Sequence, residues 1–408
     1  MGKRFFMAEI RKPEEVTYSK ARVNWMIFAV VFCMVIQGFG IFKLVPMQEA
    51  IQTYFHINEG AYGIMGSAQN WMMIVLSVPL AYVARKVPCK WGFSIGFSIA
   101  ALGMLIQILS HSFVLFVIGR MLEGGGFGFV SLTSGSLILT LVPENRRGFW
   151  SSVNIVATVL PQVIITKGGA TLMVKSGLSF KQVFAIICAM YVLAIIIWLI
   201  IVPRTVRVYG IADSTKPTRE QTMRVYKNKS NWLVSIAFVA FNGIAIGFTS
   251  YIIKFLNMKG MSMSQAANTY SYTTLIGIVA MIFFGWLADK LGTKRKIVIV
   301  GYLACALSLV LLAVLPANLM FIYVILFGTL PRSIAGLTNA TPADIAEFPM
   351  DIPIVSSVRN MVAQVGNVLM TISMGFLIQY MGYEFTIFVL AGTSVIAAIL
   401  WYFAKKIP

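Results

Sequence analysis

Apolar residues occur along this chain in blocks of about 20, separated by short polar connections. In a helix that rises about 1.5 Å per residue, such a block matches the roughly 30 Å hydrocarbon core of a bilayer. Because lipid cannot hydrogen-bond to exposed backbone groups, each block is expected to be helical. The pattern predicts an all-α membrane protein with twelve transmembrane helices, at residues 24–44, 60–84, 92–110, 113–141, 149–173, 182–202, 231–253, 263–287, 297–315, 318–341, 354–380 and 383–403.

The longest polar interior segment divides the predicted helices into two groups of six. Short matches recur across it at a nearly constant offset, which indicates an internal duplication. Ser-Ser-Val-Asn at 151–154 matches Ser-Ser-Val-Arg at 356–359, and the Gly177 and Phe180 pair matches Gly382 and Phe385. We therefore predict an N-terminal tail at 1–23, a six-helix bundle at 24–202, a central loop at 203–230 and a second six-helix bundle at 231–408.

The distribution of charge predicts the orientation of these helices. The chain is 58% hydrophobic and 12% charged, with a net charge of +19, and most of its 33 Lys and Arg fall in the tails and in the loops of one side. This is the positive-inside bias, so we expect a multi-pass protein of the cell inner membrane with both termini in the cytoplasm. The charge indicates contact with membrane lipids and argues against nucleic-acid binding. The first 23 residues contain no cleavable signal pattern.

Two motifs resemble a known family. Residues 285–295 (GWLADKLGTKR) resemble the signature loop of the major facilitator superfamily of secondary transporters, and residues 119–128 (GRMLEGGGFG) resemble its Arg-x-x-Gln-Gly-x-Gly pattern, with Glu123 in place of Gln. The resemblance implies two six-helix bundles that rock around a central site by alternating access. It also implies a gating loop, to which we assign Asp289, Lys290, Gly292, Arg295 and, in the first half, Arg85.

The first-half copy of the signature loop departs from the family pattern. Ala81, Arg85 and Pro88 stand where the family has Gly, Asp and Gly. A basic loop that only fixes the orientation of the chain therefore stays open as an alternative for this copy.

Three arginines, Arg120, Arg332 and Arg359, fall inside predicted membrane helices. A charge at such a depth costs about 2.5–3.5 kcal/mol on insertion scales and normally faces a protein interior or an aqueous cavity. Arg332 is the closest to the midplane, and its helix contains no acidic residue. Because a guanidinium binds carboxylate or phosphate through two hydrogen bonds, we predict that these arginines bind an anion. For Arg359, a gating ion pair with an acid near 344–351 stays an open alternative.

Glu123 is the only acid away from the ends of the predicted spans, and it lies three residues after Arg120 on the same helical face. Two roles stay open for it: neutralisation of Arg120, or proton coupling, because a buried acid can exchange protons. Lys43, Lys167 and Lys254 lie near helix ends and are expected to extend to the headgroups. Uncharged polar residues of the predicted spans, Tyr270 among them, are expected to line the cavity. The further substrate-binding candidates selected from these are Gln37, Tyr272, Asn242 and Gln364.

Together, the resemblance and the embedded arginines predict a secondary active transporter of a small organic anion, a mono- or dicarboxylate, working as an anion exchanger or a proton symporter. One alternative is a drug or lipophilic-cation/proton antiporter of the same fold. Another is a membrane sensor that binds a solute without moving it. No nucleotide loop, nucleophile elbow or metal-ligand cluster occurs, so we predict no enzyme activity, no metal and no cofactor. The expected partners are the anionic substrate and membrane lipids, and the expected state is a monomer.

Overall fold

The computed structural model describes residues 19–141, 147–204, 219–348 and 351–404. The predicted N-terminal tail therefore lies largely outside the described residues, as do residues 205–218 of the predicted central loop. We use the term first half for the helices up to α7, and second half for those from α9 onward. The first half contains α1 (Lys20–Phe42), the 3₁₀ turn η1 (Val45–Met47), α2 (Gln48–Phe55), α3 (Glu59–Lys86), α4 (Cys89–Leu109), α5 (Phe113–Leu141), α6 (Arg147–Ser176) and α7 (Phe180–Ile201).

A short helix, α8 (Arg219–Lys227), lies within the segment predicted as the central loop. The second half then contains α9 (Lys229–Asn242), the π-helical segment η3 (Gly243–Phe248), α10 (Thr249–Met258), α11 (Met263–Leu291), α12 (Lys294–Val314), the 3₁₀ turn η4 (Ala317–Leu319), α13 (Met320–Gly328), α14 (Leu330–Ala340), α15 (Pro342–Ile345) and α16 (Ile352–Phe403).

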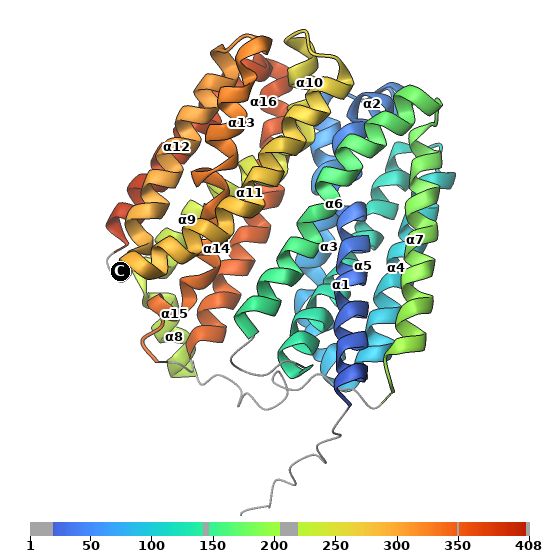
Figure 1. Ribbon diagram of the computed structural model, residues 1–408, viewed down its shortest axis with the longest axis vertical. Helices are drawn as coiled ribbons and strands as arrows, with labels where there is room; N and C mark the ends of the chain where they lie inside the picture. Colours follow the sequence, from blue (N-terminus) through green and yellow to red (C-terminus); the bar gives the residue numbers. More distant parts are fainter. Residues whose placement is uncertain (1–18, 142–146, 205–218, 349–350, 405–408) are drawn as a thin grey trace, which may run out of the picture.

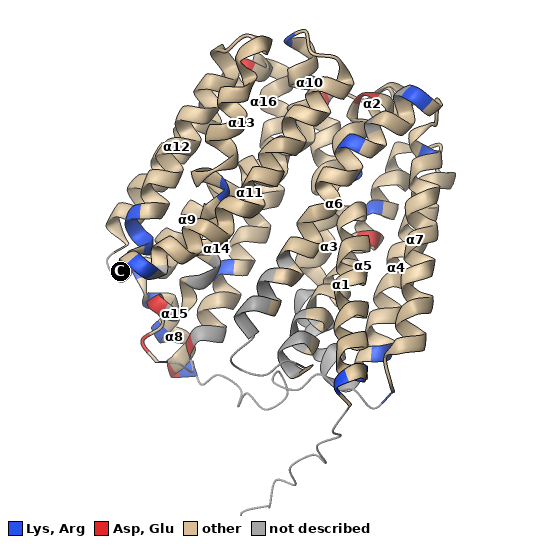
Figure 2. Ribbon diagram, viewed as in Figure 1, with Lys and Arg blue, Asp and Glu red and all other residues tan. Residues whose placement is uncertain are grey.

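The prediction of an all-α membrane fold is confirmed, since each of the twelve predicted spans coincides with helix and the described residues form no strand. Ten described segments are long and apolar enough to cross a bilayer, and one of them, Ile354–Phe403, contains two predicted spans. These two spans are separated at Gly382, whose φ of 83° is a left-handed value that a side chain disfavours. Charged residues concentrate at the ends of the helices and are sparse along their middle (Figure 2).

Two predicted spans are interrupted helices, which hydropathy alone did not indicate. The span at 231–253 passes through the π-helical segment η3. The span at 318–341 breaks at Thr329, with φ −91° and ψ −107°, and restarts as α14 with Pro331 in its first turn. A proline is tolerated there because the first turn of a helix needs no backbone N–H. The break places a helix N-terminus inside the membrane-spanning region.

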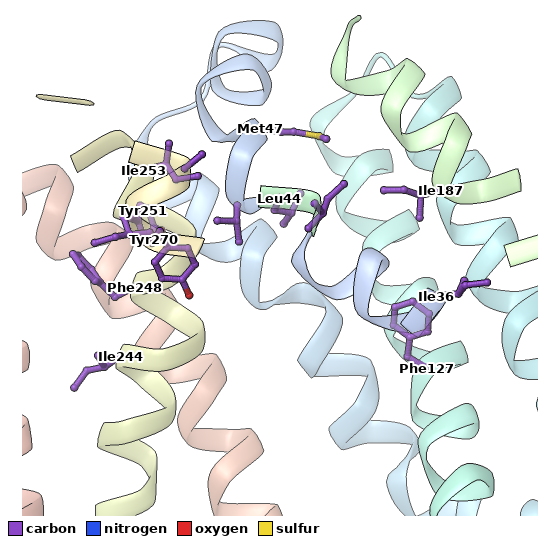
Figure 3. Packing of buried hydrophobic residues seen from close by; sticks show 14 of the residues in the cluster. Ile36, Leu44, Met47, Phe127, Ile187, Ile244, Phe248, Tyr251, Ile253 and Tyr270 are labelled. Carbon is purple, nitrogen blue, oxygen red and sulfur yellow. The ribbon is translucent and has the colours of Figure 1, made fainter. Parts of the chain in front are cut away.

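The two halves lie side by side and approach each other at the end that carries α2 and α10 (Figure 1). One buried apolar cluster contains residues of both halves, among them Leu44 and Met47 from the first and Tyr251 and Ile253 from the second (Figure 3). Here α3 and α16 pack closely, since a Cβ placed on Gly63 would lie 2.8 Å from the carbonyl oxygen of Thr371. We call this the α2 end of the molecule.

Candidate functional site

Arg332 is 8% exposed and lies in the first turn of α14. Its Nη2 donates to the Tyr270 hydroxyl at 3.2 Å and to the Thr274 hydroxyl at 3.5 Å, both on α11. The guanidinium carbon lies 5.2 Å from the centre of the Phe327 ring. Its buried Nε has no hydrogen-bond partner. Among the described residues no carboxylate lies within ion-pair distance of Arg332, so its buried charge is not neutralised.

The helix break strengthens the positive potential around Arg332. The N-terminus of an α-helix carries a partial positive charge of about half a unit, from the aligned peptide dipoles. Arg332 sits in that first turn, where an acidic side chain would be favourable and a basic one is not. An anion that bound here would be stabilised by both charges.

Gly277 on α11 makes room for the arginine side chain. A Cβ built on Gly277 would lie 2.8 Å from Cγ and 3.0 Å from Cβ of Arg332. Contacts that short do not occur, so any larger residue would displace the arginine. The sequence analysis did not select Gly277, because a lone glycine in an apolar helix carries no distinctive signal.

Arg359 on α16 is also buried, at 7% exposed, and lies against α14. Its Nη1 donates to the carbonyl oxygen of Thr338 at 2.6 Å, and its Nε has no hydrogen-bond partner. Thr338 follows Arg332 by six residues on α14, a rise of about 9 Å. Arg332 is therefore part of α14, and Arg359 contacts the same helix from α16.

The acids expected to pair with Arg359 have other partners. Asp351 accepts two hydrogen bonds from Arg224, both of 3.0 Å, and Asp344 pairs with Lys294 at 2.9 Å. Glu347 is exposed. Among the described side chains Arg359 forms no ion pair, so neither Asp344 nor Asp351 forms the gating pair that the sequence left open.

Arg120 has a different environment, inside the first half. Its Nη1 lies 3.0 Å from Glu123 Oε2 and donates to the carbonyl oxygen of Gly40 at 3.0 Å. Glu123 is fully buried and also accepts from Tyr191 at 2.7 Å and from Gln107 at 3.1 Å. These residues come from α1, α4, α5 and α7, so the structure does not bring Arg120 together with Arg332.

The expectation that Lys43 extends to the headgroups is wrong. Lys43 is fully buried, and its Nζ lies 2.7 Å and 2.8 Å from the two carboxylate oxygens of Glu123. The ring of Phe184 lies 4.5 Å from the same nitrogen. A lysine near a helix end turns inward when a buried carboxylate is within reach, because that carboxylate replaces the lost water. We call Lys43, Arg120 and Glu123 with Tyr191 and Gln107 the Glu123 network.

The four uncharged candidates lie on four different helices, α1, α9, α11 and α16. Gln37 donates to Ser131 at 3.0 Å within the first half. Asn242 ends α9 and is 8% exposed, and the buried Oε1 of Gln364 on α16 has no hydrogen-bond partner. Tyr272 is 52% exposed and follows Tyr270 by two residues, which turns it about 200° around α11. The residue that contacts Arg332 is therefore Tyr270, which was expected in the cavity but was not among the substrate-binding candidates.

The halves are joined at the α2 end by bonds to Glu59. Its carboxylate accepts from Lys254 at 2.5 Å and from Tyr383 at 3.2 Å, both in the second half. Its backbone carbonyl accepts from Tyr251 at 3.2 Å. We call Glu59, Lys254, Tyr251 and Tyr383 the latch. Lys254, expected at the headgroups, instead spans the two halves.

The predicted gating loop makes its described contacts within the second half. Lys290 lies 5.0 Å from the centre of the Trp286 ring, and Arg295 donates to the carbonyl oxygen of Tyr402. Gly292 has a φ of 61°, which explains why glycine stands at this position. The side chains of Arg85 and Asp289 lie outside the described residues, so the gating role of the loop stays a prediction.

Metal binding has no support in the described part of the chain, where no group of three or more His, Cys, Asp or Glu is placed to hold an ion. All four cysteines are free thiols.

Comparison with known proteins identifies relatives of this arrangement. The family model described as Major Facilitator Superfamily matches residues 30–347. An uncharacterised MFS-type transporter of Mycobacterium tuberculosis is 22% identical over 256 residues, which cover 62% of this chain and 55% of that protein. A sugar transporter of Arabidopsis thaliana is 28% identical over 109 residues, or 27% of this chain and 22% of the relative. The chain thus spans about half the length of the first relative, and less of the second.

Solved structures show the same fold at low sequence identity. A bacterial homologue of the human lysosomal transporter Spinster, in an inward-facing and occupied conformation, has a TM-score of 0.79 and 18% identity, and the match covers 96% of this chain and 98% of that one. A D-xylose–proton symporter has a TM-score of 0.76 and 15% identity, with 95% and 98% covered. At these identities the similarity concerns the fold alone.

Proposed function

Because this chain belongs to the major facilitator superfamily, we propose that it is a secondary active transporter that moves a small organic anion, a mono- or dicarboxylate, by alternating access. The bundles predicted at 24–202 and 231–408 are the two moving parts. The observation that carries the choice of an anion is the buried guanidinium of Arg332, which has an unpartnered Nε and no carboxylate partner among the described residues.

The energetics of Arg332 support an anionic substrate. A buried charge without a counter-charge is strongly unfavourable, and a substrate carboxylate supplies the missing partner. A discontinuous helix whose N-terminus lies in the membrane region is a recurring way to bind anionic substrate groups in secondary transporters. Arg359 on α16 donates to Thr338, which lies about 9 Å further along α14 than Arg332. It offers a second guanidinium and suits a substrate with a second anionic group.

The Glu123 network supports anion exchange over proton symport. The Glu123 carboxylate accepts hydrogen bonds from two cations, an amide and a hydroxyl, all of which stabilise its ionised form. A carboxylate held in this way is a poor carrier of protons. The same contacts disfavour a drug or lipophilic-cation antiporter, which needs an acid free to attract cations.

The orientation follows the charge distribution. With both termini in the cytoplasm, as the positive-inside bias predicts, the α2 end faces outward and the latch closes the outer side. In an alternating-access cycle, a closed outer side corresponds to the state in which the substrate reaches its site from the cytoplasm. In this proposal the loop of Asp289, Lys290, Gly292 and Arg295, with Arg85, acts at the opposite end when the bundles close there.

Exchange assays in proteoliposomes test the proposal. Vesicles loaded with unlabelled succinate should take up labelled succinate, with a rate that does not respond to an imposed pH gradient. Arg332→Gln should reduce the uptake about 10- to 100-fold, because it removes a hydrogen-bonded charge pair worth about 1.5–3 kcal/mol. The matched control is Lys175→Gln, at an exposed position. Uptake of a neutral sugar or a lipophilic cation that is equal in wild type and Arg332→Gln would refute the proposal.

A further inference from the structure

The hydroxyl of Tyr270 links Arg332 to the opposite half of the molecule. It accepts from Gln162 Nε2 on α6 at 2.6 Å and from Arg332 Nη2 at 3.2 Å, and it lies 2.8 Å from the Thr249 hydroxyl at the start of α10. Tyr270, Gln162 and Thr249 are each 3% exposed or less. The Tyr270 hydroxyl oxygen thus contacts Gln162 of the first half, Arg332, and Thr249 of α10, the helix that carries Tyr251 and Lys254 of the latch.

The direction of each hydrogen bond can be assigned from the chemistry of the groups. The Thr249 hydroxyl donates to the carbonyl oxygen of Ala245 at 2.6 Å, so it can only accept from Tyr270. An amide nitrogen and a guanidinium nitrogen are donors only. The Tyr270 oxygen therefore donates one bond and accepts two, which is its full capacity. Loss of any of these partners leaves a buried polar group unsatisfied, which is unfavourable.

From Thr249, the chain of hydrogen bonds continues to an irregular segment of the backbone. Thr249 donates to Ala245, which lies inside the π-helical segment η3, between α9 and α10. Such segments depart from the regular helical ladder and are frequent at functional sites and bends. Two and five residues after Thr249, α10 carries Tyr251 and Lys254, which bond to Glu59 of the first half. A change at Tyr270 is therefore transmitted through Thr249 to the segment that holds the latch closed.

We propose that Tyr270 is a positioning residue that couples anion binding at Arg332 to opening of the latch, an inference that rests on the proposed function. An incoming carboxylate that pairs with the Nε and Nη2 edge of Arg332 competes with Tyr270 for the Nη2 group. Tyr270 is then left with Gln162 as its only donor and one buried lone pair without a partner. This disfavours the closed arrangement. Separation of α11, which carries Tyr270, from Gln162 on α6 relieves it, because water can then reach the Tyr270 oxygen. The anion thus shifts the population toward the open latch.

Tyr270→Phe tests the coupling, because it removes one oxygen and keeps the ring. Without its competitor, succinate should bind about 3- to 10-fold more tightly, while succinate exchange should slow about tenfold. A purely structural role would instead lower stability without separating binding from turnover. The matched control is Tyr226→Phe on α8, whose ring is exposed.

Spin labels on cysteines introduced at Thr53 and Met258 measure opening of the latch. These two residues come from opposite halves and line one pocket together with Glu59 and Lys254 of the latch. Succinate should lengthen their separation in wild type and leave it unchanged in Tyr270→Phe. Gln162→Leu, which breaks only the bond between the halves, should lengthen the separation without succinate.

The outcomes separate the two proposals. If wild type does not bind succinate, the proposed function fails and the coupling fails with it. If wild type binds succinate through Arg332 but Tyr270→Phe shows the same succinate-induced lengthening, the coupling alone is overturned.

Discussion

Arg120 and Arg332 are both arginines buried within the membrane-spanning region, yet their surroundings differ. Arg120 pairs with Glu123, which also binds Lys43, and so belongs to a buried network of ion pairs and hydrogen bonds in the first half. Arg332 contacts two hydroxyls and two aromatic rings and has no acidic partner among the described residues. The comparison teaches that the counter-charge, rather than the depth of the arginine, distinguishes a structural charge from one available to a ligand.

The largest expected effect comes from breaking the Glu123 network. Glu123→Gln removes the one negative charge between Lys43 and Arg120, which leaves two buried cations unpaired. Loss of one partner of a buried ion pair typically costs about 3–5 kcal/mol. Thermal unfolding of the purified protein should show a large loss of stability. Wild-type stability in Glu123→Gln would mean that the network does not neutralise Arg120.

The second largest effect is expected on succinate affinity, when a larger residue at Gly277 displaces the Arg332 side chain. Gly277→Ala would place a methyl group 2.8 Å from Cγ of Arg332, so the guanidinium must move. Succinate affinity should fall about tenfold, equivalent to about 1.4 kcal/mol, as measured by titration calorimetry. Gly392→Ala is the matched control, since nothing lies within 4 Å of a Cβ at that position. Equal affinity in the two variants would contradict the placement of the substrate at Arg332.

A smaller effect is expected at the latch. Glu59→Gln weakens the ion pair with Lys254. In this pair the lysine side chain is 31% exposed and the glutamate side chain is 13% exposed. Partly exposed pairs are worth about 1 kcal/mol or less, so the population of the open latch should rise several-fold at most. The spin-label pair at positions 53 and 258 measures this shift. An unchanged distance distribution would show that other contacts close the α2 end.

The smallest expected effect on stability is that of replacing Arg332, and it is the most informative for the comparison with Arg120. Replacing Arg332 by Met removes a buried charge that has no acidic partner, and such replacements are often neutral or stabilising. Removal of the uncompensated charge offsets the one hydrogen bond that the Tyr270 hydroxyl loses. Without ligand, Arg332→Met should therefore unfold within about 0.5 kcal/mol of wild type or at higher temperature. Arg120→Met, by contrast, should destabilise. If both variants lose the same stability, the two arginines are equivalent and the distinction drawn above is wrong.

The fold was largely predictable from the sequence, because hydropathy reports directly which residues enter lipid. The twelve spans and the turn at Gly382 follow from apolar blocks and a repeated motif. The partners of buried charges could not be predicted in the same way. Lys43 and Glu123 are 80 residues apart and meet only in three dimensions. Composition therefore placed Lys43 at the membrane surface, and the structure places it in the core.

Within the candidate site, the sequence selected Arg332 and placed Tyr270 in the cavity, but it did not show how the residues around the arginine are arranged. The break at Thr329 lies in a continuous apolar block whose only local signal is Pro331. Tyr270 and Tyr272 are equivalent by composition, and only the rotation of α11 against α14 decides which of them meets the arginine. The contact with Gly277 likewise depends on how these helices pack.

Titration calorimetry of purified wild type and Arg332→Gln with succinate and with a neutral sugar tests the central claim most directly. Succinate should bind wild type, and Arg332→Gln should weaken this binding about 10- to 100-fold, while the sugar should bind to neither protein. Sugar binding that is equal in both proteins, with no response to succinate, would contradict the claim that Arg332 holds an anionic substrate.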